Sequence, residues 1–376
     1  MWRKGRETWW KYFFKGCFFV LLLLAGLRAA VLLLYPPNAI VRTWHRFYAL
    51  GEGEAQILVV GSSHAYSTFD PSVISRITGK SSYILASNSQ NTVQAFFNVK
   101  EALHYQRPEA IILEAFSLDD NNNWRYGDNP DRDWKKEANI DGMRFGLTKL
   151  EAVAEQYERR NWGYALLPIA RCHGNWEDFG AVNANLDFYT EGIREYSSFH
   201  PSETSMSAET ARRYDQAEYN PAEWVISEAN IRHFHKLASL CREEGIPFYV
   251  VMSPMYEGYI RSVNYDSCTE QIAELAESEE VIFLDCNLYY DRNPNTMLGL
   301  HTLTLSERNF FVMLLGLILL MATDYRKRKG TDFKGVLARQ NIWFRWLIYY
   351  ALIFGILIFG VYGPEYDASA FIYFQF

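Results

Sequence analysis

The stretch that most constrains this chain is a short apolar run that ends in a polar turn. Residues 56–60 are Gln-Ile-Leu-Val-Val, and Gly61 is followed by Ser62, Ser63 and His64. A β-branched run of this length predicts a buried strand. Ligands of open α/β sheets bind outside the carboxyl ends of the strands, so these three polar side chains are expected where chemistry occurs. A serine on such a turn can present its hydroxyl near backbone N–H groups that stabilise an oxyanion. A polar loop without catalysis is the alternative.

Strand and helix patterns alternate after this turn. Further strands are expected at residues 82–86, 110–114, 247–252 and 281–285. Helices are expected at residues 71–78, 92–105, 221–244 and 268–279. This alternation favours an α/β domain with a doubly wound, parallel, five-stranded sheet in three layers. Its strand arrangement is expected to be flavodoxin-like.

The alternation fails at about residues 117–220, which predicts a large insertion. This segment is rich in Asn, Asp, Trp, Tyr and Arg. It leaves from the carboxyl end of the third predicted strand, so it is expected to cover the site. Its composition suits a carbohydrate-binding surface, and it equally suits a loop-rich cap that packs on itself.

The N-terminus predicts a membrane anchor. Residues 1–15 contain five Lys and Arg residues, and residues 16–35 are almost wholly apolar, long enough to cross a bilayer. An uncleaved signal-anchor is favoured over a cleaved signal peptide, because no small-residue cleavage site follows the run. The basic flank places the N-terminus in the cytoplasm. Residues 36–300 then form an extracytoplasmic domain at the cell membrane.

Two more membrane spans are expected near the C-terminus. Residues 303–323 and 342–362 are mainly apolar and flank a basic segment at residues 324–341. The basic segment is expected in the cytoplasm, which leaves residues 363–376 as an extracytoplasmic tail.

Composition excludes several classes of function. The net charge is −7 and there is no basic stripe with interleaved aromatic residues, so no nucleic-acid partner is expected. The five cysteines match no zinc-binding spacing, and there is no Gly-rich phosphate loop. We therefore expect no metal and no cofactor. Both a disulfide in the outer domain and free buried thiols are compatible with the cysteine positions.

Four motifs carry a family resemblance. They are Gly-Ser-Ser-His at residues 61–64, Leu-Ala-Ser-Asn-Ser-Gln at 85–90, Ile-Ile-Leu-Glu at 111–114 and His-Gly-Asn-Trp at 173–176. Over about residues 56–285 the chain resembles the SGNH (GDSL-like) hydrolase superfamily. More narrowly, it resembles the membrane-anchored SGNH-like proteins that partner MBOAT O-acyltransferases.

The resemblance implies roles for several residues. Ser63 would be the nucleophile, and the backbone N–H groups of Ser63 and Ser89 would form the oxyanion hole. Ser89 replaces the usual glycine of the family, but a backbone donor is retained. Asn88 lies beside this donor as a further substrate-binding candidate. The asparagine of the family's third motif has three candidates: Asn121, Asn122 and Asn123.

The sequence departs from the family at the general base. The family ends with Asp-x-x-His after the last strand, where histidine is the base and aspartate orients it. Here His301 follows Leu-Gly-Leu, so the aspartate is absent at that spacing, and Asp291 is the nearest substitute in that loop. His64 is adjacent to Ser63, and a neighbour on a tight turn seldom points its ring back at the hydroxyl.

The tail carries a second resemblance. Residues 340–346, residues 359–364 and the ending Phe-Ile-Tyr-Phe-Gln-Phe at residues 371–376 are similar to the C-terminal end of an MBOAT protein. The surroundings of that family's catalytic histidine have no match here, so the tail would be a fragment joined by fusion or rearrangement. Two generic membrane helices are the alternative.

Two kinds of function follow. As an enzyme, the chain would be a serine-dependent O-acyltransferase or esterase that acts on an extracellular glycan or cell-envelope polymer through an acyl-serine. It would work beside an MBOAT-type acyltransferase at the membrane. As a degenerate relative, it would be a non-catalytic glycan-binding or scaffold partner of that machinery. The discriminating feature is whether a histidine reaches Ser63.

Overall fold

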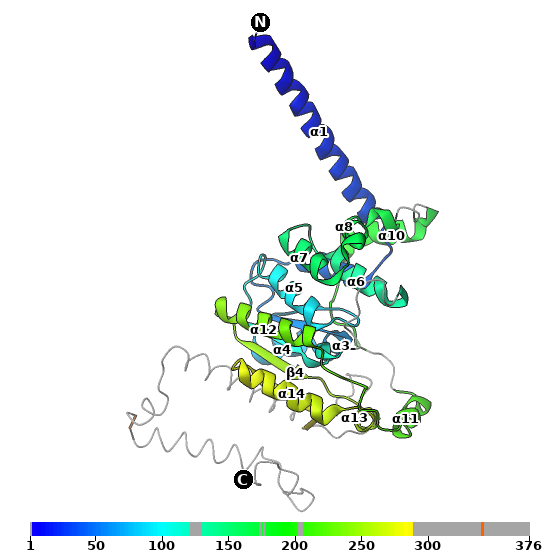
Figure 1. Ribbon diagram of the computed structural model, residues 1–376, viewed down its shortest axis with the longest axis vertical. Coiled ribbons are helices and arrows are strands. Elements are labelled where there is room, and N and C mark those ends of the chain that lie inside the picture. Colours follow the sequence, from blue (N-terminus) through cyan, green and yellow to red (C-terminus); the bar gives the residue numbers. More distant parts are fainter. Residues whose placement is uncertain are drawn as a thin grey trace, which may run out of the picture. The chain divides into compact units, whose positions relative to one another are not determined.

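Figure 1 shows a computed structural model of the chain, which describes residues 2–120, 130–172, 175, 177–201, 206–288 and 340–341. The chain divides into two compact units, Met1–Thr304 and Leu305–Phe376. Only residues 340 and 341 of the second unit are described. The two C-terminal membrane spans and the MBOAT-like ending lie outside the described residues and stay predictions.

The first unit contains an all-parallel sheet of five strands, as the sequence predicts. The strands are β1 (Ile57–Gly61), β2 (Ser82–Ala86), β3 (Ala110–Glu114), β4 (Phe248–Met252) and β5 (Ile282–Asp285). Their order in the sheet is β2-β1-β3-β4-β5, with every neighbouring pair parallel. The chain order reverses between β1 and β3, and in a sheet of this order the reversal marks the usual ligand site.

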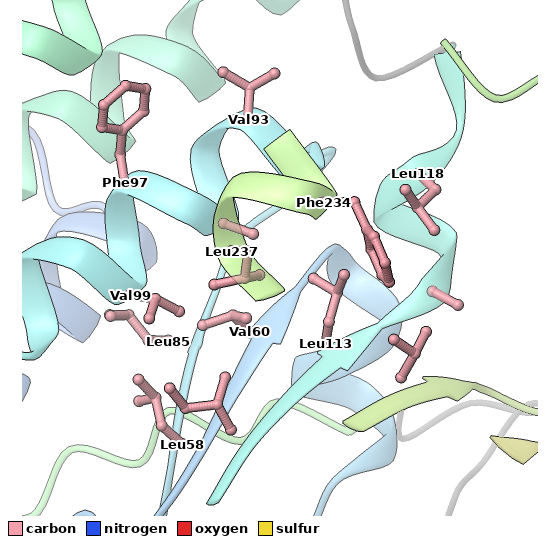
Figure 2. Packing of buried hydrophobic residues seen from close by; sticks show 14 of the residues in the cluster. Leu58, Val60, Leu85, Val93, Phe97, Val99, Leu113, Leu118, Phe234 and Leu237 are labelled. Atoms are coloured by element: carbon pink, nitrogen blue, oxygen red, sulfur yellow. The ribbon is translucent and has the colours of Figure 1, made fainter. Parts of the chain in front are cut away.

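Three helices share the main hydrophobic core on one face of the sheet. They are α5 (Thr92–Ala102), α12 (Glu228–Glu243) and α14 (Tyr265–Ser278). Figure 2 shows Val60 and Leu113 of the sheet beneath Leu237 of α12. Residues of all three helices belong to the same buried cluster as alternate strand residues. This alternation is expected of strands that bury different residues on each face.

Two short helices occupy the β1–β2 connection. They are α3 (Ser63–Thr68) and α4 (Pro71–Thr78). The bounds of α4 agree with the prediction for local reasons: the side chain of Asp70 caps its N-terminus, Pro71 is its first residue, and Gly79 ends it with φ +69°.

The expected connector between the anchor and the sheet is partly helical. Helix α2 (Ala39–Tyr48) is capped by Asn38 and buries Trp44 and Phe47 in the core. The long helix expected at residues 221–244 begins later, because Ser227 caps α12 at its start and Trp224 has φ +62°. Helix α13 (Glu257–Ser262) follows β4.

The insertion is mainly helical. Its α-helices are α6 (Pro130–Gly142), α7 (Leu147–Gln156), α8 (Trp162–Leu166), α9 (Ile169–Cys172), α10 (Phe179–Asp187) and α11 (Ala208–Asp215). Short 3₁₀ or π turns in the first unit are η1 (Ala115–Leu118), η3 (Arg159–Asn161), η5 (Phe188–Gly192) and η6 (Cys286–Leu288). The sequence did not predict these helices, most of which have ten residues or fewer.

The N-terminal helix α1 (Trp2–Leu34) is longer than the span predicted from the sequence. Its segment Phe13–Leu34 is long and apolar enough to cross a membrane, and none of it is buried in the protein. A membrane anchor and a signal sequence both fit that observation. Side chains of the insertion hydrogen-bond to the carbonyls at its end: Asn175 donates to Leu34 over 3.1 Å, and Asn185 donates to Leu33 over 3.2 Å.

The cysteines of the first unit are free. Cys172, Cys241, Cys268 and Cys286 are buried without a disulfide, and Cys17 on α1 is exposed. Of the two alternatives left open by the sequence, the structure therefore has the free buried thiols.

Candidate functional site at the carboxyl ends of β1 and β3

Gly61 allows the ends of β1 and β3 to approach closely. Its φ is +149°, and a Cβ at this position would lie 2.6 Å from Cβ of Glu114 and 3.3 Å from Cβ of Ala65. Any larger residue would push Glu114 away, because real carbon atoms do not approach so closely. A glycine is therefore required at the point where the predicted Gly-Ser-Ser-His turn begins.

Ser62 and Ser63 have different environments. Ser62 is buried and caps α3: its Oγ accepts a hydrogen bond from the backbone N–H of His64 (3.3 Å) and donates to Oε2 of Glu114 (2.9 Å). Ser63 is the first residue of α3 and is only half-buried. Of the two serines, Ser63 is therefore the one accessible to a substrate.

The hydroxyl of Ser63 hydrogen-bonds to Tyr66 on the same helix. Burial raises the pKa of Tyr66, and the hydrogen bond with Ser63 opposes that rise. The hydroxyl of Tyr66 in turn donates to Oδ1 of Asn88, which follows β2. The predicted residues Ser63 and Asn88 are thus brought together through a tyrosine that sequence reasoning missed.

The turn after β2 is held by the insertion. Ser89 has φ +53°, a left-handed conformation that is uncommon for a residue other than glycine. Lys135 of α6 donates to Oγ of Ser89 over 3.0 Å. Asn139, one turn further along α6, donates to Oγ of Ser87 (3.1 Å) and to Oε1 of Gln90 (3.2 Å). Helix α6 therefore covers this side of the site, as expected of the insertion.

A histidine–carboxylate pair lies beside Ser63. Nδ1 of His64 is 3.9 Å from Oε1 of Glu114, and its ring stacks on Phe116 with the ring centres 4.3 Å apart. Glu114 is fully buried, whereas 32% of the His64 side chain is exposed. The ring of His64 is directed at Glu114 and Phe116, in keeping with the expectation that it does not point back at Ser63.

Burial raises the pKa of Glu114. The charge of His64 opposes the rise, as do hydrogen bonds from the Phe116 backbone N–H and the Ser62 hydroxyl. The net direction is upward, so a carboxylic acid lies at the topological switch point in an environment that favours its neutral form. Such perturbed groups in a cleft are typical of functional sites. The sequence signal for it was a charged residue at the end of a fully buried strand.

His200 contributes packing rather than a base. Its backbone N–H donates to the carbonyl of Tyr66 (2.9 Å), and its Nε2 hydrogen-bonds with the hydroxyl of Tyr196 (3.1 Å). Burial lowers its pKa, so the neutral ring is favoured. Its contacts are those of a residue that packs the insertion against α3.

The predicted catalytic set is only partly described. Ser63, Asn88 and Ser89 lie around one site, whereas Asn121, Asn122, Asn123, Asp291 and His301 fall outside the described residues. Within residues 2–120, 130–172, 175, 177–201 and 206–288, no histidine ring hydrogen-bonds to Ser63. The same residues hold no group of three His, Cys, Asp or Glu side chains that could bind a metal ion.

Comparisons with known proteins add no assignment. No protein-family model matches the chain. No curated protein matches it at a significant level.

Proposed function

We propose that this chain is a membrane-anchored SGNH-like protein that takes part in O-acylation of an extracellular glycan or cell-envelope polymer through an acyl-serine at Ser63. One observation carries the proposal. A half-exposed serine hydroxyl lies at the start of α3, where the strand order reverses, and is joined through Tyr66 to the turn at Asn88. Ligands bind at this place in sheets of this order.

The chemistry would proceed in two steps. Oγ of Ser63 attacks the carbonyl carbon of an acyl donor, its proton passes to a base, and the tetrahedral intermediate expels the donor's carrier group. A glycan hydroxyl then attacks the acyl-serine, gives up its proton and releases Ser63; water in place of the glycan makes the protein an esterase. The backbone N–H groups of Ser63 and Ser89 are the proposed donors to each oxyanion.

Two histidines compete for the role of base. His301 lies in the loop where the family resemblance expects the base, and Asp291 is the proposed substitute for the absent aspartate. His64 is the candidate in the described residues, because it follows Ser63 and is partly exposed, but its ring is directed at Glu114 and Phe116 and would have to turn toward Ser63 to act as the base.

The contacts between the candidate site and α1 support an acyl donor that is held at the membrane. Helix α6 contacts the β2 turn through Lys135 and Asn139, and near its other end Asp141 pairs with Arg171 of α9. Helix α9 contacts α1, whose apolar segment could cross a membrane. A site joined to the anchor in this way suits an acyl group delivered at the membrane by an MBOAT-type partner. We propose that the domain is extracytoplasmic and the N-terminus cytoplasmic.

A non-catalytic role is the second candidate. The observation that favours it is the hydrogen bond of Ser63 to Tyr66, a poor general base at neutral pH because its pKa is raised. In that case the domain would bind a glycan or serve as a scaffold for the MBOAT machinery.

The test uses the full-length chain and a fluorophosphonate serine probe. Wild type is expected to be labelled, and Ser63→Ala is expected to lose the label, while Ser75→Ala on the exposed face of α4 keeps it. His64→Asn and His301→Asn then identify the base, since removing it slows labelling by roughly 100-fold or more. A folded wild-type chain without Ser63-dependent labelling overturns the enzymatic proposal in favour of the non-catalytic one.

A further inference from the structure

Helices α7, α8 and α10 of the insertion expose an unusual number of large apolar side chains. The exposed fraction is 73% for Phe145, 79% for Leu147, 55% for Leu167 and 71% for Phe179. Other exposed members are Leu150, Trp162, Tyr164 and Leu186. We call these eight residues the apolar platform. Surfaces of soluble proteins seldom gather so many large apolar groups, and such gatherings usually mark an interaction site.

The platform belongs to the elements that hold the end of α1. Helix α7 contacts α8, and α9 and α10 contact α1 (Figure 1). Asn185 of α10 donates to the carbonyls of Leu33 and Tyr35, and Asn175 donates to that of Leu34. The last turn of α1 is therefore fixed to α10, the helix that carries Phe179 and Leu186 of the platform.

The position that α1 would take in a bilayer indicates that lipid covers the platform. Its apolar segment ends at Leu34, so a bilayer that contains this segment has its polar interface next to the insertion. The contacts of α9 and α10 with α1 and the hydrogen bonds to the carbonyls of Leu33, Leu34 and Tyr35 place the insertion beside the end of that segment.

The side chains of the platform suit that environment. Trp162 and Tyr164 are amphipathic rings of the kind that gather at membrane interfaces. Arg159 and Arg160 precede them and are exposed, where they can reach anionic headgroups. The fully apolar members provide the area that enters the acyl boundary.

We propose that the apolar platform inserts into the interface of the same bilayer that α1 crosses. The domain then lies on the membrane surface rather than at the end of a tether. This proposal depends on α1 as an anchor and not on the chemistry of Ser63. A lipid surface is the proposed occupant; a second copy of the chain and a partner protein are the alternatives that the test separates.

The test is a spin-label accessibility measurement on the full-length chain, reconstituted at one chain per lipid nanodisc. Cys17→Ser removes the exposed thiol, and that variant alone controls for labelling of the buried cysteines. A cysteine is then introduced at Phe179, at Leu167 or at Tyr219. Tyr219 is the matched control, because it is 59% exposed and hydrogen-bonds to Asn264 at the start of α14, away from the platform.

We expect labels at Phe179 and Leu167 to be accessible to oxygen, which dissolves in lipid, and shielded from a water-soluble nickel chelate. The label at Tyr219 should be open to the chelate. Equal chelate accessibility at all three sites overturns the proposal, since neither a partner nor a second copy is present. Shielding that arises only when several chains share one disc also overturns it and assigns the platform to self-association.

Discussion

At the scale of the residue, burial gives two neighbouring serines different roles. Ser62 is 1% exposed and hydrogen-bonds to a buried carboxyl group, so it holds β1, α3 and β3 together. Ser63 is accessible, and its hydroxyl interacts with that of Tyr66 on its own helix. Sequence alone cannot separate such residues, because the difference lies in what each hydroxyl faces.

Replacement of Ser62 by alanine should destabilise the domain more than the same change at Ser63. Ser62→Ala removes a helix cap and leaves an oxygen of Glu114 buried without its donor, a loss of about 1–3 kcal/mol. Ser63→Ala removes one partly exposed hydrogen bond. Thermal unfolding of the two variants should give a clearly lower Tm for Ser62→Ala. Equal values of Tm would contradict the structural role of Ser62.

The raised pKa of Glu114 predicts a pH-dependent stability. Its pKa in the folded chain lies above the unfolded value of about 4.3, so the protonated form is the one favoured by folding. The stability from this group is full below the unfolded pKa and is lost as the pH rises through the folded pKa. The glutamine of the variant Glu114→Gln does not titrate. The Tm of wild type minus the Tm of this variant should therefore fall as the pH rises.

A difference in Tm that grows with pH would contradict this assignment. It would mean that Glu114 is held as a carboxylate, with a folded pKa below its unfolded value. Glu109→Gln is the control, because that carboxylate is about half exposed and pairs with Lys80 at the surface.

At the scale of the element, local sequence patterns predicted the strands of the sheet but not the helices of the insertion. The strands were predictable because each is a short run of mainly apolar residues between polar turns, and α4 because its ends carry Asp, Pro and Gly signals. The helices of the insertion were not predictable, because most are short and several of their large apolar residues are exposed, and contacts between distant residues, such as Arg171–Asp141, help to hold them. The same contrast applies to the site. Ser63, Asn88 and Ser89 follow strand ends, whereas Lys135 comes from a helix that periodicity did not reveal.

The pair Arg171–Asp141 should be an important contact within the insertion. The side chains are 14% and 2% exposed, and the guanidinium nitrogen is 2.5 Å from the carboxylate. Arg171→Ala leaves Asp141 buried without its partner, so a loss of about 3–5 kcal/mol is expected.

A surface pair provides the matched control. Arg107 and Glu244 also lie 2.5 Å apart, but their side chains are 75% and 36% exposed. Arg107→Ala should cost no more than about 1 kcal/mol. Thermal unfolding of both variants checks the contrast, and equal losses would show that burial does not govern these pairs.

At the scale of the whole first unit, one helix connects the site to the anchor. Helix α6 has 13 residues, with Lys135 and Asn139 directed to the β2 turn and Asp141 paired with α9, which contacts α1. The candidate site is therefore fixed relative to α1. This arrangement fits a protein that receives an acyl group at a membrane and passes it to a polymer outside.

The most direct test of the central claim is peptide mapping by mass spectrometry of the full-length chain after brief exposure to p-nitrophenyl acetate and acid quenching. The account predicts one acetyl group on Ser63 of wild type, and none at that peptide in Ser63→Ala. Acetylation elsewhere that persists in Ser63→Ala, or a folded wild-type chain with an unmodified Ser63, would contradict the claim that Ser63 forms an acyl-serine.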